Sequence, residues 1–353
     1  MKTALVAVRG RRAPAMGRDV GPLADALAAA GFAADKVFVL DGEDAHEFGQ
    51  TVLECKNFFD AVLFSAAADK LPALRGRAAE LLKTEGEGGV LEAAGKLFFF
   101  LPTGEEGAAA VYGEAVPRLQ ERFGRRGCSV LRAVGVPAAR LEGLRSSLGE
   151  GIVCDVADDY GDVRVALSYA ADTPQSRVDE AVQAAAAALE GYLYAIDDTP
   201  LCRRAVELLK LRKMRLSCAE SFTGGNVAAR IVSVPGASEV FYEGVVAYDN
   251  GSKARRLGVR GETLSRSGAV SDDTAYEMAV GLLNTGCCDV ALATTGIAGP
   301  ASDGTDKPVG LCYIAAGTRE AVFVYKYILR GSREDITRQA VNRALFLLCK
   351  QIR

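Results

Sequence analysis

The sequence predicts an α/β protein in three parts: a three-layer α/β domain at residues 1–126, a small α+β domain at residues 127–195, and a second α/β domain at residues 196–353. A length of 353 residues is enough for two or three domains. In the first part, short apolar runs alternate with amphipathic stretches, which is typical of parallel strands joined by helices. The alternation changes after residue 126 and is most regular again from residue 199.

Residues 1–126 contain apolar runs of strand length separated by stretches of helical periodicity. The expected strands lie at residues 2–8, 36–40, 60–66 and 96–104, and the expected helices at residues 19–32, 45–58 and 113–124. An Ala-, Lys- and Glu-rich helix is expected before the last strand. This order predicts a parallel sheet with helices packed on its faces.

Residues 127–195 have a different pattern of expected strands and helices. The expected strands are residues 129–136, 151–158 and 162–170, and the expected helices are residues 139–149 and 176–193. The following stretch, AIDDTP, reads as a linker, with Thr199 capping the next helix and Pro200 at its first position.

The third part is predicted in more detail. Helices are expected at residues 199–214, 227–234 and 253–259, strands at residues 241–248, 289–294, 310–317 and 320–329, and a glycine-rich loop at residues 294–310. Asn250 and Gly251 predict a turn. Ser271 and Ser332 are expected to cap two further helices. The first of these helices has an apolar face formed by Ala275, Met278, Ala279, Leu282 and Leu283.

Composition excludes several classes of protein. The chain is 49% apolar and 25% charged, as expected for a globular protein, and its net charge of −3 argues against a nucleic-acid-binding surface. No apolar run approaches the length of a bilayer span, and the N-terminal ALVAV is too short for a signal-peptide core. Nine cysteines without a CxxC motif predict free, buried thiols and a cytoplasmic protein.

Histidine chemistry is almost excluded, because His46 is the only histidine and lies in the acidic segment DGEDAHEF. A Ser-His-Asp triad would need His46 to reach a distant serine, and a His-rich zinc site is impossible. We expect His46 to be a solvated loop residue. A general base in the second half of the chain must therefore be Lys, Asp, Glu or Tyr.

The stretch SCAESFTGGNVAARIV, residues 217–232, is the first candidate for a site. Ser221 and Thr223 lie on a turn before a helix, where unpaired N–H groups and the helix dipole favour an anion. Gly224 lets a ligand approach the main chain closely. The alternative is an ordinary helix cap with a glycine bend.

Five motifs in order then identify a resemblance: SCAESFTGG, VPGASEVFYEGVVAYDNGSKARRLGV, SGAVSDDTAYEMAVG, TTGIAGPASDG and KPVG. They resemble the C-terminal domain of the CinA (competence/damage-inducible) family over essentially all of residues 199–353. The resemblance implies a nicotinamide mononucleotide deamidase, an enzyme that converts the carboxamide to a carboxylate and releases ammonia. Three positions depart from the usual family residues: Phe222 stands for Cys, Asp249 for Ser and Ser332 for Asp.

The first part of the chain is similar, more loosely, to the molybdopterin-binding (MoaB-like) domain of the same family. Where that domain has an acidic TGDE-type strand end, this chain has AVRGRRAPAMGRD, and its GGLGPT-type loop is here SAAADKLPALRG. The resemblance implies the fold. We expect no pyrophosphatase activity there. The first segment is basic, and the second has one carboxylate, Asp69, and no glycine at the end of the strand to wrap a phosphate.

Amide hydrolysis needs a nucleophile, a proton acceptor and donors to the oxyanion. Ser221 is the expected nucleophile. The resemblance implies that Lys253 lies nearby as its base, which requires burial to lower its pKa, and that Tyr248 relays the proton or lies against the pyridinium ring. The further expected substrate-binding residues are Thr223, Gly224, Asn250, Thr295, Gly296, Gly299, Arg333 and Arg338. For Lys253, Arg333 and Arg338, a solvated surface position is the alternative. No metal or other cofactor is expected.

Three functions follow for comparison. The first is the deamidase, a cytoplasmic hydrolase that acts on nicotinamide mononucleotide. We expect it to form a homo-oligomer, a dimer, and to bind neither nucleic acid nor a membrane. The second is a non-catalytic nucleotide-binding or regulatory CinA-like protein, which Phe222 beside the nucleophile leaves open. The third is ADP-ribose pyrophosphatase activity in the N-terminal domain. Ser221, Lys253 and Tyr248 together favour the first.

Overall fold

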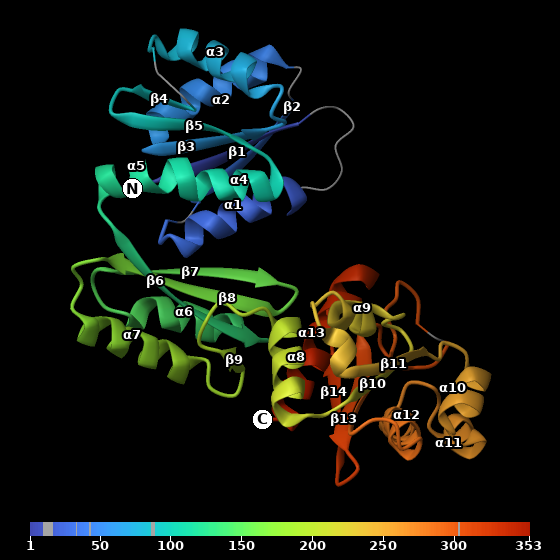
Figure 1. The fold of residues 1–353 in the computed structure, drawn as a ribbon. Coiled ribbons are helices and arrows are strands. Elements are labelled where there is room, and N and C mark those ends of the chain that lie inside the picture. Colours follow the sequence, from blue (N-terminus) through green and yellow to red (C-terminus); the bar gives the residue numbers. More distant parts are fainter. Residues whose placement is uncertain (10–16, 33, 42–43, 86–88, 303) are drawn as a thin grey trace. The chain divides into compact units, whose positions relative to one another are not determined.

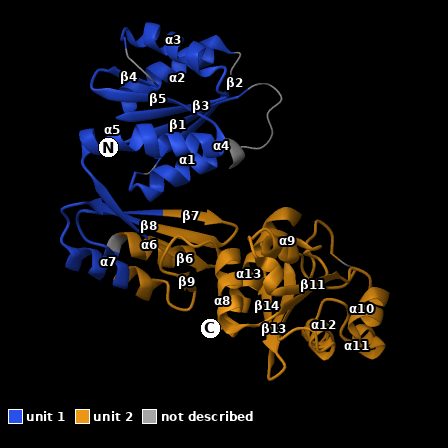
Figure 2. Ribbon diagram, in the orientation of Figure 1, with its two compact units in different colours: residues 1–129, 147–155, 166–183 blue, residues 130–146, 156–165, 184–353 orange. Residues whose placement is uncertain are grey.

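A computed structural model describes the whole chain except residues 10–16, 33, 42–43, 86–88 and 303. It confirms the α/β class: three sheets follow one another along the chain, each with its own helices (Figure 1). The chain forms two compact units (Figure 2). The first unit comprises residues 1–129, 147–155 and 166–183, and the second comprises residues 130–146, 156–165 and 184–353. The division therefore passes through the middle sheet.

The N-terminal sheet has the strand order β2-β1-β3-β5-β4. Its first four strands are parallel: β1 (Thr3–Arg9), β2 (Lys36–Asp41), β3 (Ala61–Ala66) and β5 (Lys96–Pro102). The edge strand β4 (Val90–Ala93), which the sequence did not predict, pairs antiparallel with β5. The sheet is therefore mixed, with one reversed edge.

Helices cover both faces of this sheet, because successive strand residues point to opposite sides. Leu63 packs with α1 (Gly17–Ala29), whereas the next residue, Phe64, packs with α2 (Ala45–Phe58) and α3 (Leu71–Leu82). These two apolar cores give the expected three layers.

Three expectations for this region need comment. The last helix was predicted at 113–124 but begins much earlier, as a continuous run of α4 (Gly104–Ala110), a π-helical turn η1 (Val111–Ala115) and α5 (Val116–Phe123). His46 is not in a loop: it lies exposed in the first turn of α2, which Asp44 caps by accepting its N–H. Asp69 is exposed in the turn after β3, whereas residues 10–12 of the basic segment lie outside the described residues.

The middle sheet has the order β7-β8-β6-β9, with helices α6 (Ala138–Ser147) and α7 (Gln175–Ala188). Its strands are β6 (Arg126–Val134), β7 (Ile152–Asp159), β8 (Asp162–Ala170) and β9 (Leu193–Ala195). The helix predicted to reach residue 193 stops at Ala188, because Gly191 adopts a left-handed conformation, φ 84°. The chain then adds β9 antiparallel to β6, from the last residue of the expected helix to Ala195, the first residue of the expected linker.

The C-terminal sheet lies wholly in the second unit and has the order β11-β10-β12-β13-β14. Three neighbouring strands are parallel: β10 (Leu216–Glu220), β11 (Phe241–Val246) and β12 (Val290–Gly296). The remaining strands, β13 (Leu311–Thr318) and β14 (Val322–Ile328), are antiparallel hairpin partners. The carboxyl ends of the three parallel strands therefore lie at one edge.

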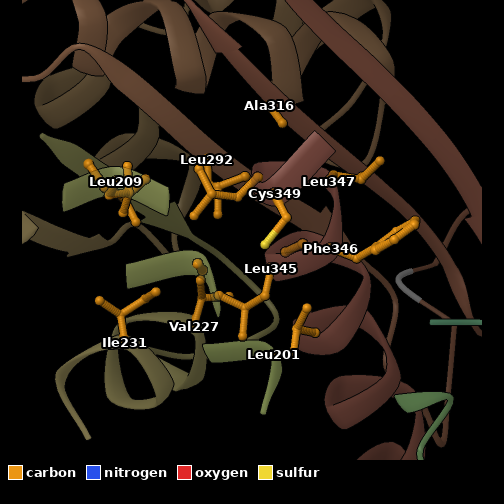
Figure 3. Packing of buried hydrophobic residues seen from close by; sticks show 14 of the residues in the cluster. Leu201, Leu209, Val227, Ile231, Leu292, Ala316, Leu345, Phe346, Leu347 and Cys349 are labelled. Atoms are coloured by element: carbon orange, nitrogen blue, oxygen red, sulfur yellow. The ribbon is translucent and has the colours of Figure 1, made fainter. Parts of the chain in front are cut away.

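Apolar side chains on opposite faces of β12 build two cores. Leu292 packs against α8 (Leu201–Arg212), α9 (Asn226–Val232) and α13 (Arg333–Gln351), as Figure 3 shows for Leu209, Val227 and Leu345. Ala291 and Ala293 instead pack against α12 (Asp272–Asn284), which lies on the other face.

Local caps in this domain are partly as predicted. Ser271 caps α12 through Thr274, the apolar face of α12 is buried, and Ser332 forms a capping box with Asp335 at α13. The Thr199 cap is wrong: Pro200 is the N-cap residue and its side chain cannot accept a hydrogen bond.

The Asn250–Gly251 turn is also wrong. Both residues belong to the first turn of α10 (Asn250–Leu257), because Asp249 acts as N-cap and accepts the Gly251 N–H at 2.7 Å. Lys253 is therefore held on a helix.

Two further properties of the described chain complete this picture. No helix within it combines the length and apolar character needed to cross a bilayer. None of the nine cysteines forms a disulfide; five are buried and four are partly exposed.

Candidate active site

The candidate site lies where the sheet order changes direction. From β10 the chain passes through α9 to its neighbour β11 on one side, and returns through α12, on the other face, to β12 on the other side. In open α/β sheets, ligands bind at the carboxyl ends of strands beside such a switch. Ser221 directly follows β10, and Thr295 and Gly296 end β12, so these expected residues lie at this edge.

Ser221 and Lys253 form a buried pair. Lys253 Nζ lies 3.1 Å from Ser221 Oγ, and it also donates a hydrogen bond to the Tyr248 carbonyl at 3.0 Å. Ser221 is 7% exposed and Lys253 is 1% exposed. A short connection after β11 leads into helix α10, and Lys253 lies on the buried side of this helix. The pair therefore has the hydrogen-bond distance that proton transfer between serine and amine requires.

Burial also changes the acidity of Lys253. Removal of the ammonium group from water lowers its pKa from the ordinary value, and the nearby Asp249 carboxylate offsets this only in part. A lysine with a lowered pKa is neutral in a larger fraction of molecules at a given pH. Only the neutral amine can accept a proton, so burial favours a base role for Lys253.

Glu220 is a part of the site that sequence reasoning missed. Its carboxylate, 1% exposed, accepts the backbone N–H groups of Gly225 and Val227 at 3.0 and 3.1 Å, and that of Ala228 at 2.9 Å. The N–H groups at the start of α9 were expected to bind a ligand anion, but this internal anion satisfies them. The sequence pattern that could have predicted this role is a carboxylate a few residues before two glycines and the start of a helix.

Glu220 should therefore fix the shape of the nucleophile turn. Replacing Glu220 with glutamine leaves one acceptor oxygen and turns an NH₂ group toward backbone N–H donors. We expect the Glu220→Gln protein to lose about 1–3 kcal/mol in the free energy of unfolding, measured by urea denaturation. The control is Glu239→Gln, which breaks an exposed ion pair with Lys210 and should cost under about 1 kcal/mol. Equal losses in the two proteins would contradict this role.

The backbone after the nucleophile still offers donors. In the described part of the chain, the N–H groups of Phe222 and Thr223 meet no hydrogen-bond acceptor, whereas those of Ser221 and Gly224 are bonded to Thr294 and Ser221 carbonyls. The Thr223 hydroxyl lies 2.6 Å from the Thr294 hydroxyl, which ties the turn to the end of β12. Two adjacent N–H groups directly after a nucleophile suit a developing oxyanion.

A cavity of about 630 Å³ lies beside this turn. It is lined by five of the predicted site residues: Thr223, Gly224, Tyr248, Arg333 and Arg338. The remaining lining residues were not predicted: Asp159, Tyr160, Phe222, Asn226, Arg230, Glu334, Thr337, Val341 and Asn342. Six of the fourteen belong to α13, whose helical spacing directs one broad face into the cavity.

Arg333 links two walls of the cavity. It donates hydrogen bonds to the Gly299 carbonyl at 2.7 Å and to the Tyr248 hydroxyl at 3.0 Å. Tyr248 is 60% exposed, and its hydroxyl accepts this bond from Arg333. Tyr248 reaches Lys253 only through its backbone carbonyl. In this geometry Tyr248 is a wall of the cavity.

Four predicted substrate-binding residues do not line the cavity. Asn250 is exposed at the start of α10. Thr295 is buried and donates to the Ala269 carbonyl at 2.6 Å, while Gly296 allows close packing, since a Cβ there would lie 2.6 Å from that of Cys312. The Gly299 carbonyl accepts a hydrogen bond from Arg333 and so holds that cavity-lining side chain.

Phe222, which replaces the family's usual cysteine, packs away from the reacting atoms. It is 6% exposed and belongs to an apolar cluster with Ala298, Leu329 and Ile336. We expect Phe222→Cys to keep turnover within about tenfold but to lower the free energy of unfolding by about 2–4 kcal/mol through the cavity it leaves. Parallel steady-state kinetics and denaturation test this. Phe222→Leu, which fills more of the space, should lose less stability; a larger loss would contradict the packing explanation.

Metal ligands are a separate question. Within the described residues, no group of three or more His, Cys, Asp or Glu side chains is arranged to hold a metal ion.

Comparisons with known proteins show the family to which this chain is related. A family model described as the CinA C-terminal domain matches residues 198–352. A Caldanaerobacter subterraneus protein named as competence-damage inducible is 35% identical over 295 residues, covering 82% of this chain and 70% of that protein. A CinA-like protein of Kosmotoga olearia is 45% identical over 154 residues, covering 44% of this chain and 37% of that protein. Among solved structures, a CinA superfamily protein of Klebsiella pneumoniae is 33% identical with a TM-score of 0.42, covering 43% of this chain and 95% of that one.

Proposed function

This chain belongs to the CinA family, and on that premise we propose that it hydrolyses the carboxamide of nicotinamide mononucleotide to give nicotinic acid mononucleotide and ammonia. The observation that carries the proposal is the buried Ser221–Lys253 pair, with 3.1 Å between Oγ and Nζ. The motifs of residues 199–353 support the substrate, since they resemble those of the family's deamidase domain.

The reaction begins with a proton transfer. Neutral Lys253 accepts the Ser221 hydroxyl proton while Oγ forms a bond to the carboxamide carbon. Negative charge then develops on the amide oxygen, where the Phe222 and Thr223 N–H groups stabilise it. Lys253 returns the proton to the leaving nitrogen, and the C–N bond breaks to release ammonia. Water, activated by the neutral lysine, hydrolyses the resulting Ser221 ester.

The cavity provides for the rest of the substrate. Its polar lining includes three guanidinium groups, those of Arg230, Arg333 and Arg338, of which Arg333 is already bonded to Gly299 and Tyr248. Arg230 Nε is buried without a hydrogen-bond partner among the described residues, and Arg338 pairs with the largely exposed Glu334 carboxylate, which a phosphate can displace. These two arginines are the proposed partners of the 5′-phosphate. The Tyr248 ring, exposed in the wall beside the nucleophile, is the proposed surface for the cationic pyridinium.

Ammonia release from nicotinamide mononucleotide tests this function directly. The purified full-length protein, without added metal, should form one ammonia and one nicotinic acid mononucleotide per substrate consumed. Binding of the nucleotide without any ammonia release would instead support the non-catalytic binding protein. Absence of both binding and release would overturn the proposal. We also propose that the protein acts in the cytoplasm, in keeping with nine cysteines of which none forms a disulfide.

A further inference from the structure

The cavity is completed by residues outside the matched CinA C-terminal domain. Asp159 and Tyr160 line it from the turn between β7 and β8, whereas the family model begins at residue 198. This turn belongs to the same compact unit as α13 and the nucleophile turn (Figure 2). The middle segment of the chain therefore supplies part of the wall of the candidate site.

Tyr160 occupies an unfavourable backbone position. Strand β7 ends at Asp159 and β8 starts at Asp162, leaving a two-residue turn in which Tyr160 and Gly161 both have positive φ, 53° and 82°. Such turns favour Asn, Asp or Gly at the first central position, because other side chains strain the left-handed conformation. Asparagine would suit the turn better than tyrosine. The aromatic ring at this position therefore needs a reason other than turn stability.

The turn is held against α13. Asn342, 5% exposed, donates hydrogen bonds from Nδ2 to the Asp159 carbonyl at 2.9 Å and to the Tyr160 carbonyl at 3.2 Å. On the other side, Gly135 donates its N–H to the Gly161 carbonyl at 2.6 Å. These bonds use backbone atoms of the turn, so they leave the Tyr160 side chain available for another role.

The Tyr160 ring lies against a cation of the cavity. The Arg338 guanidinium carbon is 4.3 Å from the centre of the ring, and both residues line the cavity. Stacking uses one face of the guanidinium plane, whereas a phosphate oxygen binds to N–H donors that lie within that plane. Glu334 lies 3.6 Å from Arg338 as the competing partner, with 73% of its side chain exposed. The ring therefore restrains a long side chain that only an exposed ion pair would otherwise hold.

We propose that Tyr160 is a specificity-determining residue that orients Arg338 toward the phosphate of a nucleoside monophosphate and closes the phosphate end of the cavity. This inference rests on the proposed function for the identity of the substrate. Beyond that function, the middle segment makes the site selective for the phosphorylated nucleotide over the corresponding nucleoside.

Three variants of the full-length protein test this. Tyr160→Asn removes the ring and suits the turn, so its melting temperature should equal or exceed that of the unchanged protein. Its KM for nicotinamide mononucleotide should rise about tenfold with kcat within about threefold, while nicotinamide riboside, which lacks the phosphate, should be affected less than about twofold. Tyr160→Phe keeps the stacked ring and should bind nearly normally.

The matched control is Tyr192→Ala. It also removes an Arg–Tyr stack from the middle segment, with Arg140 at 5.4 Å, but Tyr192 does not line the cavity. It should leave both KM values unchanged. Calorimetric binding of nicotinamide mononucleotide to Ser221→Ala proteins, with and without Tyr160→Asn, gives a second readout that does not need turnover.

The outcomes separate this inference from the proposed function. Weaker nucleotide binding in Tyr160→Asn with retained stability supports the inference, even if no ammonia is ever released and the proposed function fails. Ammonia release with an unchanged KM in Tyr160→Asn overturns the inference and leaves the function intact. Loss of stability with equal losses for nucleotide and nucleoside overturns it in favour of a structural role. No nucleotide binding by the unchanged protein overturns both.

Discussion

The Ser221→Ala protein is expected to release ammonia from nicotinamide mononucleotide about 10⁴-fold more slowly than the unchanged protein, or slower still. Alanine has no oxygen to form the covalent ester, and losing a nucleophile removes the whole two-step route. The remaining rate should come from substrate binding and the backbone donors alone. Single-turnover and steady-state ammonia assays on the full-length protein measure this loss.

The fold should survive this change, because one small side chain replaces another. Ser217→Ala is the control. Ser217 is another buried serine, which lies on β10 four positions before Ser221, and its replacement should leave turnover within about threefold. Binding of nicotinamide mononucleotide to Ser221→Ala should also be retained. Near-normal turnover in Ser221→Ala would exclude Ser221 as the nucleophile.

Lys253→Arg should be almost as damaging as Lys253→Met, with each lowering turnover by about 10³-fold or more. Arginine keeps the positive charge but does not lose its proton in proteins, so it cannot accept one from Ser221. Methionine has a similar length and no charge to bury; it should therefore retain or increase stability while losing activity. The control Lys210→Arg changes a partly exposed lysine paired with Glu239 and should be neutral. Substantial activity in Lys253→Arg would mean that the lysine supplies charge only.

The pH dependence of kcat/KM reports the same group. Because burial lowers the pKa of Lys253, the active neutral amine should accumulate at a pH below the ordinary lysine value, and the rate should rise with pH to a plateau. In the unfolded chain the amine stays protonated up to its ordinary pKa. Between the two values the unfolded state binds more protons, so the free energy of unfolding should rise with pH. Lys253→Met should lack this contribution, and a pH-independent rate would contradict the base role.

Much of the architecture follows from local patterns. Alternating apolar runs and helical stretches predicted the α/β class, and the periodicity of residues 272–284 predicted the buried face of α12. Ser271 and Ser332 cap as predicted, because a cap depends on a side chain and N–H groups only three residues away. Where two local signals competed, the prediction failed: Asn250–Gly251 favours a turn, but the Asp249 cap starts a helix there.

The composition of the site depended on contacts between distant segments. Ser221 became a candidate from its own turn, with an ordinary helix cap as the alternative. Lys253 is 32 residues away and reaches Ser221 through the parallel packing of β10 and β11 and the helix that follows. Glu220 is a local exception, because it accepts N–H groups only five to eight residues later in the chain. Tyr160 enters the cavity through bonds from Asn342, 182 residues later. Periodicity and capping are encoded within one or two turns of chain, whereas sheet order and long-range packing decide which distant side chains share a cavity.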